Sequence, residues 1–354
     1  MLTVEAPDFP VATSYRAPAP GRSPEREVPD AVIDTLRTTD GDVLVFLAGA
    51  ADIRRAEAAL STRIPADVTL TPLHGNLPAG EQDRALQPDA AGRRKVILST
   101  PIAETSVTID GVRAVIDTGR RRRPQLDLGR GMSGLVTVNA SQAATDQRRG
   151  RAGRQTPGTC IRLWPEVDQA RRRLDEPPEI LTTDLTAFAL ALAAWGAHDP
   201  SELRWLDPPP PASLAAARGV LTVLGAIDDQ RRLTAHGRSM AALGTEPRLA
   251  HLLLRGVELG HVGTACDLAA LLSDRDILSG RHRPADLRVR LDAMRHRRPG
   301  ADDARVRAAR RLAERWRRHF DAGDEPADED AVGVLISIAF PDRIARRRSE
   351  PGSF

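Results

Sequence analysis

Lysine is almost absent from this sequence. Lys95 is the only one, although Lys and Arg together number 51 in 354 residues. A phosphate-binding loop of the Walker type needs Gly-Lys followed by Ser or Thr, and Lys95 stands between Arg94 and Val96. The chain therefore contains no such loop, which excludes ATP hydrolysis by the usual P-loop arrangement within this sequence alone.

Cysteines, long apolar runs and aromatic residues are also scarce. Cys160 and Cys266 are too few for a disulfide framework or a cysteine metal cluster, so we expect no metal site. No run of about 18 apolar residues could span a membrane, and the N-terminus lacks the order of a signal peptide, so we expect a cytoplasmic protein with no membrane partner. Aromatic residues make up 3%, which argues against stacking of bases as the chief mode of nucleic-acid binding.

Arginine is what the sequence has in abundance, although the net charge is only +3. Ala, Pro and Gly are abundant too, so a GC-rich genome accounts for most surface arginines. It does not account for the cluster "QRRGRAGR" at residues 147–154. The planar guanidinium group suits phosphate better than the lysine ammonium does, so the cluster indicates a phosphate partner. The alternative is a solvated basic helix.

Hydrophobic patterning predicts three folded regions after a leader or linker at residues 1–28. From 29 to 170, short apolar runs such as "VLVFLAG", "KVILST" and "GLVTVN" alternate with helical spacing, which predicts an α/β domain with a parallel sheet. Residues 171–245 read as helix, short hairpin and helix, which favours a winged-helix domain. Residues 246–354 predict a helical bundle.

The arginine cluster itself is predicted to lie on a helix that begins after an N-cap at Ser141. Gln147, Arg151 and Arg154 follow at spacings of four and three, which places them on one helix face. The two glycines of the cluster cost about 1 kcal/mol each in a helix. They therefore indicate the close approach of another surface or a ligand.

Two segments carry a resemblance to a known family. "QRRGRAGR" resembles motif VI of superfamily 2 helicases in their DEAH-box form, and "STPIAETSVTIDGVRAVIDTG" at residues 99–119 resembles motif V. "VLVFLAG" is similar to the motif IV strand. Their order matches the second RecA-like domain, and the later segments are similar to the winged helix and helical bundle of the bacterial HrpB group. The resemblance covers about residues 10–345 and identifies the chain as the C-terminal part of such a helicase, with the bundle truncated.

The resemblance implies a nucleotide site shared between two RecA-like lobes, with ATP and Mg²⁺ bound mainly by a first lobe that this chain does not contain. Arginine fingers from the second lobe then stabilise the transferred phosphoryl group. Three residues match catalytic positions of the family: Arg151 and Arg154 as arginine fingers, and Gln147 beside the γ-phosphate and the attacking water. Three more are expected near the nucleotide: Asp110, Gly150 and Arg148.

The resemblance also implies contacts with RNA or single-stranded nucleic acid. Short hydroxyls can donate to backbone phosphates without reading the bases, although capping and turn formation are the alternative role for such residues. The segment "TGRRRRPQLDLGRGMSG" corresponds to the family's strand-separating β-hairpin, or else is a solvated charge run. The expected nucleic-acid-binding residues are Thr100, Thr105, Ser106, His74, Gly75, Arg120 and Arg121.

Three functional hypotheses follow. The first is the C-terminal portion of an ATP-dependent RNA helicase, inactive by itself because the P-loop and the Asp-Glu-x-His box are absent. The second is a module without enzymatic activity that binds single-stranded nucleic acid. The third is a partner that supplies its arginines in trans to another protein's first RecA-like lobe.

Overall fold

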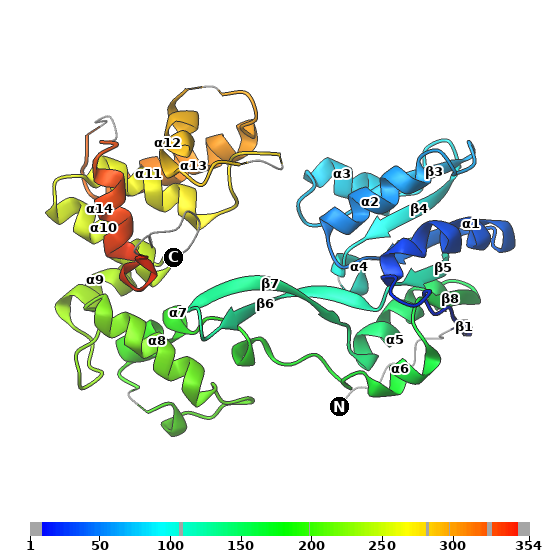
Figure 1. Cartoon of the computed structure of the whole chain (residues 1–354), viewed down its shortest axis with the longest axis horizontal. Helices are drawn as coiled ribbons and strands as arrows, with labels where there is room; N and C mark the ends of the chain where they lie inside the picture. Colours follow the sequence, from blue (N-terminus) through cyan, green and yellow to red (C-terminus); the bar gives the residue numbers. More distant parts are fainter. Residues whose placement is uncertain are drawn as a thin grey trace. The chain divides into compact units, whose positions relative to one another are not determined.

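The computed structural model describes residues 9–105, 109–197, 199–280, 283–296, 298–323 and 328–345. The chain divides into two compact units. Unit 1 comprises residues 1–125 and 134–178, and unit 2 comprises residues 126–133 and 179–354. Unit 1 contains the parallel strands, and unit 2 is mainly helical (Figure 1).

A six-stranded parallel sheet forms the centre of unit 1, in the order β1-β8-β5-β2-β4-β3. The central strands are continuous apolar runs because both of their faces are buried, as parallel sheets require. This confirms the predicted α/β fold with a parallel sheet. The strands are β1 (Val11–Tyr15), β2 (Asp42–Phe46), β3 (Val68–Leu73), β4 (Arg94–Ser99), β5 (Val112–Asp117) and β8 (Gly158–Arg162).

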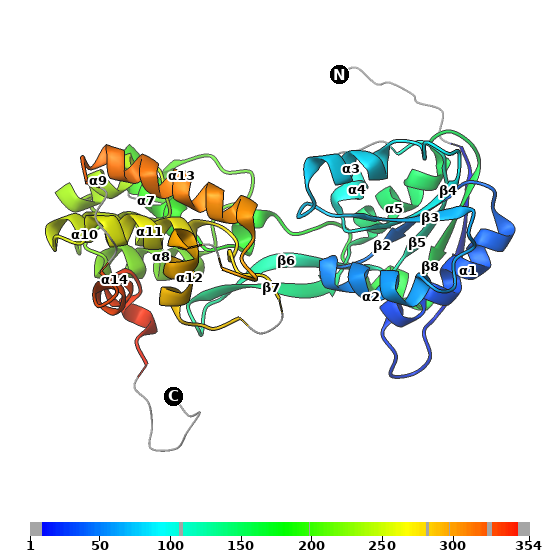
Figure 2. The same cartoon turned by 90° about the horizontal axis from the view of Figure 1, so that it is seen from above.

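Helices cover both faces of this sheet (Figure 2). On one face, α1 (Val28–Thr38) and α2 (Ala50–Leu60) pack against Val43 and Val45 of β2. Leu44 and Phe46 point to the opposite face, since side chains alternate along a strand. That face carries α3 (Ala79–Leu86), α4 (Ile102–Thr105) and α5 (Gln142–Gly150), and β8 leads on to the short α6 (Glu166–Arg171).

The leader predicted at residues 1–28 is wrong for its described part. Val11–Tyr15 forms the edge strand β1, which pairs in parallel with β8, and Pro24–Arg26 forms a 3-10 turn, η1. Three of the five β1 residues are exposed, so an edge strand of this kind carries little of the apolar patterning that marks a buried strand. The prediction of a linker therefore rested only on the composition of this segment.

A two-stranded sheet extends from the main one. It consists of β6 (Arg120–Asp127) and β7 (Met132–Asn139), and the four residues between the strands require an antiparallel pair. The hairpin implied by the resemblance is thus present. The "GLVTVN" run belongs to β7 and was wrongly assigned to the parallel sheet, because β-branched residues favour both kinds of strand.

Unit 2 is mainly helical and has two apolar clusters. The first cluster combines α7 (Thr186–Trp195), α8 (Pro211–Val223) and α9 (Ala235–Ala242), with a short antiparallel bridge between Ile227 and Leu233. The second combines α10 (Pro247–Glu258), α11 (Val262–Ser273), α12 (Leu287–Arg295), α13 (Asp303–His319) and α14 (Ala331–Ala339). The 3-10 turns η3 (Glu179–Leu181), η4 (Pro200–Glu202) and η5 (Pro341–Arg343) complete the unit. In the described part of the chain, every helix is too short or too polar to cross a bilayer.

Candidate functional site

The helix that carries the arginine cluster begins as predicted and ends earlier than predicted. The Ser141 hydroxyl caps α5 by accepting the Ala144 N–H at 3.1 Å. The α-helix stops at Gly150, and Arg151–Gly153 form a 3-10 turn, η2. The expected single helix face is therefore wrong in part: Gln147 and Arg154 are exposed, whereas the Arg151 residue is 6% exposed.

Arg151 is held against the main chain of α4. Its Nε donates to the backbone carbonyl of Glu104 at 2.8 Å, and its Nη2 donates to the same oxygen. Burial and, to a smaller extent, the nearby charge of Arg154 lower the pKa of Arg151 to about 10, against the opposing effect of Glu104. The guanidinium is therefore charged at neutral pH, and the partner oxygen in this contact is neutral.

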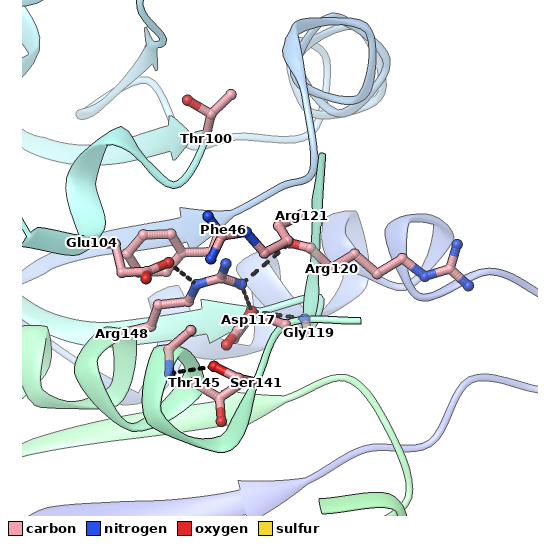
Figure 3. A network of polar contacts seen from close by, with 12 residues as sticks. Phe46, Thr100, Glu104, Asp117, Gly119, Arg120, Arg121, Ser141, Thr145 and Arg148 are labelled. Carbon is pink, nitrogen blue, oxygen red and sulfur yellow. Dashed lines mark hydrogen bonds and ion pairs between the residues drawn. The ribbon is translucent and has the colours of Figure 1, made fainter. Parts of the chain in front are cut away.

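Arg148 is completely buried in an ion-pair network, which Figure 3 shows. Its Nε lies 3.0 Å from Glu104 Oε2, and its Nη1 lies 2.9 Å from Asp117 Oδ1. The guanidinium also lies over the ring of Phe46, at 5.2 Å from the ring centroid. Burial opposes the charged form, but the two carboxylates outweigh it and raise the pKa of Arg148. Two carboxylates hold Nε and Nη1 of Arg148, while its buried Nη2 has no hydrogen-bond partner among the described residues, so the predicted nucleotide contact of Arg148 stays a prediction.

Glu104 joins the two arginines. Its carboxylate accepts from Arg148, while its backbone carbonyl accepts from Arg151. Asp117, at the end of β5, completes the network and also accepts the Gly119 N–H at 2.7 Å. Sequence analysis did not select Glu104 or Asp117, although both lie within the segment that resembles motif V. In the sequence, these residues are two carboxylates close to strand ends. Such carboxylates indicate a buried ion pair only when the arginine that pairs with them is known.

A second group of predicted residues lies where neighbouring strands end. β3 and β4 are parallel and pair Leu73 with Ser99, so the residues that follow them emerge at the same edge of the sheet. The Thr100 N–H donates to the Leu73 carbonyl at 3.1 Å, which joins the two strand ends. His74, whose Nδ1 accepts the Asn76 N–H, and Gly75 come directly after β3. The structure thus brings His74, Gly75 and Thr100 together.

The hairpin arginines have carboxylate partners within unit 1. Arg121 lies 3.2 Å from Glu176, and Arg120 lies 3.7 Å from Glu25. Their side chains remain 24% and 38% exposed, so a role in nucleic-acid binding stays a prediction for both. Thr105 is exposed at the end of α4, and Ser106 lies outside the described residues.

Asp110 lies at the opposite edge of the sheet, before β5 begins. Its Oδ1 accepts from Gln155 Nε2 at 2.8 Å, and the Gln155 side-chain oxygen accepts the Gly111 N–H at 3.0 Å. The contact with Gln155 thus brings Asp110 close in space to the end of the arginine cluster, which Gln155 directly follows. The sequence analysis missed Gln155, since an isolated glutamine carries no pattern. No cluster of three or more metal-ligating side chains occurs within the described ranges.

The two glycines of the cluster have different surroundings. A Cβ at Gly153 would lie 2.6 Å from the Phe9 carbonyl oxygen, whereas a Cβ at Gly150 would meet nothing within 4 Å. The expected close approach is thus explained within the chain for Gly153. We expect Gly153→Ala to destabilise unit 1 by about 1–3 kcal/mol through overpacking. Gly150→Ala should be neutral or stabilising by up to about 1 kcal/mol.

Thermal unfolding of the two alanine variants measures this difference. Equal melting temperatures for Gly153→Ala and Gly150→Ala would contradict the steric argument.

Comparison with known proteins agrees with this geometry. Residues 27–156, from the start of α1 to just beyond the arginine cluster, match the helicase conserved C-terminal domain. This part of the chain is thus similar to a helicase C-terminal domain. Over 351 residues, 99% of the chain, the sequence is 38% identical to the ATP-dependent RNA helicase HrpB of Escherichia coli (strain K12). It is 36% identical over 308 residues to the pre-mRNA-splicing factor ATP-dependent RNA helicase prp22 of Schizosaccharomyces pombe.

Solved structures show that the similarity extends beyond residues 27–156 to nearly the whole chain. Two crystal structures of Escherichia coli HrpB, titled as a DExH-box NTPase and as a DEAH/RHA helicase, superpose with TM-scores of 0.83 and 0.86 at 37% identity. Each comparison covers 98% of this chain. The chain spans 41% of the length of the HrpB relative and 26% of prp22. It corresponds to the C-terminal portion of these DEAH-type helicases.

Proposed function

We propose that the chain is the C-terminal portion of an ATP-dependent RNA helicase and that it supplies Arg151 and Arg154 to a nucleotide bound by a first RecA-like lobe. One observation carries the proposal. At the end of α5, Arg151 is charged and bound to a neutral carbonyl, beside the exposed Arg154 and Gln147.

The hydrogen bond from Arg151 to the Glu104 carbonyl suits an arginine that must leave this oxygen and bind a phosphate group. A hydrogen bond from a guanidinium to a neutral carbonyl is weaker than one to an anionic phosphate oxygen. A phosphoryl group brought to this position would therefore compete well for the Arg151 donors. Arg148, by contrast, is tied to two carboxylates and acts as a positioning residue, since Glu104 accepts from it and from Arg151.

ATP and Mg²⁺ fit this chain only in part. Arg151, Arg154 and Gln147 offer donors for phosphate oxygens, and Gly150 leaves space beside them. The described carboxylates form no group that could hold the metal ion. When bound, ATP supplies the phosphoryl group whose negative charge the arginines stabilise in the transition state. We propose that a first RecA-like lobe binds the metal and most of the nucleotide, with Asp110 of this chain close to the nucleotide.

RNA binding is proposed for the strand-end group. His74, Gly75 and Thr100 lie at one edge of the sheet, and the exposed Thr105 ends the helix that follows Thr100. The hairpin arginines Arg120 and Arg121 would add phosphate contacts. We also propose a winged-helix domain at residues 171–245, a helical bundle at 246–354 and a cytoplasmic location. The two apolar clusters of unit 2 support this division, although α10 contributes to both.

The chain alone is expected to show no ATP turnover at a helicase-like rate, because it has no P-loop. Phosphate release with and without RNA, measured on the purified chain, checks this. Adding a separately purified first lobe from a DEAH-type relative should restore RNA-stimulated hydrolysis. Full turnover by the chain alone would contradict the proposal, whereas RNA binding without rescue would favour the nucleic-acid-binding module.

A further inference from the structure

A cavity of about 410 Å³ in unit 1 lies apart from the residues assigned above to ATP. Thr118 and Leu163, which directly follow β5 and β8, form part of its wall. It therefore opens at the carboxyl ends of two neighbouring parallel strands, where ligands bind in open α/β sheets. Segments from four other parts of unit 1 complete the wall: the loop before η1, the start of β6, the end of β7, and α6 with the residue after it.

Four arginines line this cavity: Arg22, Arg120, Arg171 and Arg172. Three of them have carboxylate contacts, at 3.6 Å for Arg22, 3.7 Å for Arg120 and 3.4 Å for Arg171. These contacts are longer than the 2.9 Å and 3.0 Å contacts of the buried Arg148. The three side chains are 56%, 38% and 74% exposed, so the pairs contribute little and their donors can turn to another anion.

The fourth arginine is fixed in place without a carboxylate. Arg172 Nη1 donates to the carbonyl oxygens of Gly119 and Ala140 at 2.7 and 2.9 Å, which ties together the two ends of the hairpin. Its guanidinium lies over the Trp164 ring, 4.0 Å from the centroid. Among the described residues, no carboxylate oxygen lies within 4.0 Å of it, and its buried Nε has no hydrogen-bond partner. Arg172 thus places a fixed positive charge on the cavity wall, with Asp117 and Asp168 as the carboxylates that act on it from a distance.

We propose that this cavity binds a phosphoryl group. Four guanidinium groups around one cavity outnumber their three carboxylate partners, and planar guanidinium forks match phosphate oxygens. The group could belong to free inorganic phosphate or pyrophosphate, or to the terminal phosphate of a nucleic-acid strand. The proposal goes beyond the proposed function, because it requires no first lobe and uses neither Arg151 nor Arg154; of the residues proposed for RNA binding, it includes only Arg120.

The test compares two arginines that differ mainly in location. Arg171 is 74% exposed and lies 3.4 Å from Asp168 at i,i+3, while Arg37 is 73% exposed and lies 3.5 Å from Asp34 at i,i+3. Only Arg171 lines the cavity. The whole chain and the variants Arg171→Gln and Arg37→Gln are titrated by calorimetry with pyrophosphate at constant ionic strength. The same proteins are titrated with one single-stranded oligoribonucleotide carrying either a 5′-phosphate or a 5′-hydroxyl.

Arg171→Gln is expected to weaken pyrophosphate binding about tenfold, while Arg37→Gln leaves it unchanged. If the 5′-phosphate also strengthens oligonucleotide binding, and Arg171→Gln removes that gain, the source is a strand terminus. If pyrophosphate binding alone responds to Arg171→Gln, the source is free phosphate. The proposal would be overturned if the wild-type chain showed no pyrophosphate binding and no preference for the 5′-phosphate. Equal behaviour of the two variants would also overturn it. None of these outcomes changes the result expected in the ATPase rescue experiment. Failure of this proposal can therefore be distinguished from failure of the proposed function.

Discussion

Arg151→Ala is expected to lower the RNA-stimulated ATPase rate of the reconstituted two-lobe enzyme by about 10³-fold or more, the usual loss when an arginine finger is removed. The loss should fall on kcat, because the charge is needed where the transferred phosphoryl group develops its transition-state charge. Steady-state phosphate release at saturating ATP and RNA measures it. Since Arg151 also binds the Glu104 carbonyl, the melting temperature of the variant is recorded alongside.

The matched control is Arg149→Ala, two positions away in the same arginine cluster. The Arg149 side chain is 43% exposed, and its Nε lies 3.7 Å from the Asp146 carboxylate. It should retain its ATPase rate, since nothing directs its charge to the nucleotide. Binding of labelled RNA to Arg151→Ala should stay at the wild-type level. An Arg151→Ala enzyme that folds normally and hydrolyses ATP at the wild-type rate would remove the basis of the proposed function.

Arg148→Met is expected to destabilise unit 1 by about 3–5 kcal/mol, the usual result of removing one partner from a buried ion pair. Asp117 has no exposed surface, and among the described residues it would keep the Gly119 N–H as its hydrogen-bond donor. Methionine keeps most of the side-chain volume, so the effect isolates the charge. Denaturant dependence of hydrogen exchange at the β5 amides reports on this unit separately from unit 2.

Two further variants test the cause of that loss. Arg149→Met changes the adjacent, half-exposed arginine and should alter stability by less than about 0.5 kcal/mol. Adding Asp117→Asn to Arg148→Met removes the stranded carboxylate charge, so the double variant should recover part of the lost stability. Unchanged β5 protection in Arg148→Met would show that the network contributes nothing.

Much of unit 1 could be predicted from sequence because its signals are local. The β2 and β4 strands are short apolar runs, and the Ser141 cap precedes α5 by one residue. The exposed edge strand β1 was not predicted, because its partner residues in β8 lie 147 positions further along the chain and "VATSY" has no apolar pattern that indicates a strand. In "GLVTVN", strand propensity was recognised, but propensity does not say which strand becomes the neighbour.

The candidate site could likewise be predicted from the sequence only in part. By itself, the sequence determined that arginine would be concentrated at residues 147–154, that a helix capped by Ser141 would lead into this cluster, and that the chain has no P-loop. Only the tertiary structure decided that Arg148 is buried, that Arg151 rests on a carbonyl and that Arg154 is exposed. The physical reason is distance along the chain. The carboxylates that hold Arg148 come from positions 31 and 44 residues away, and packing alone brings them to it.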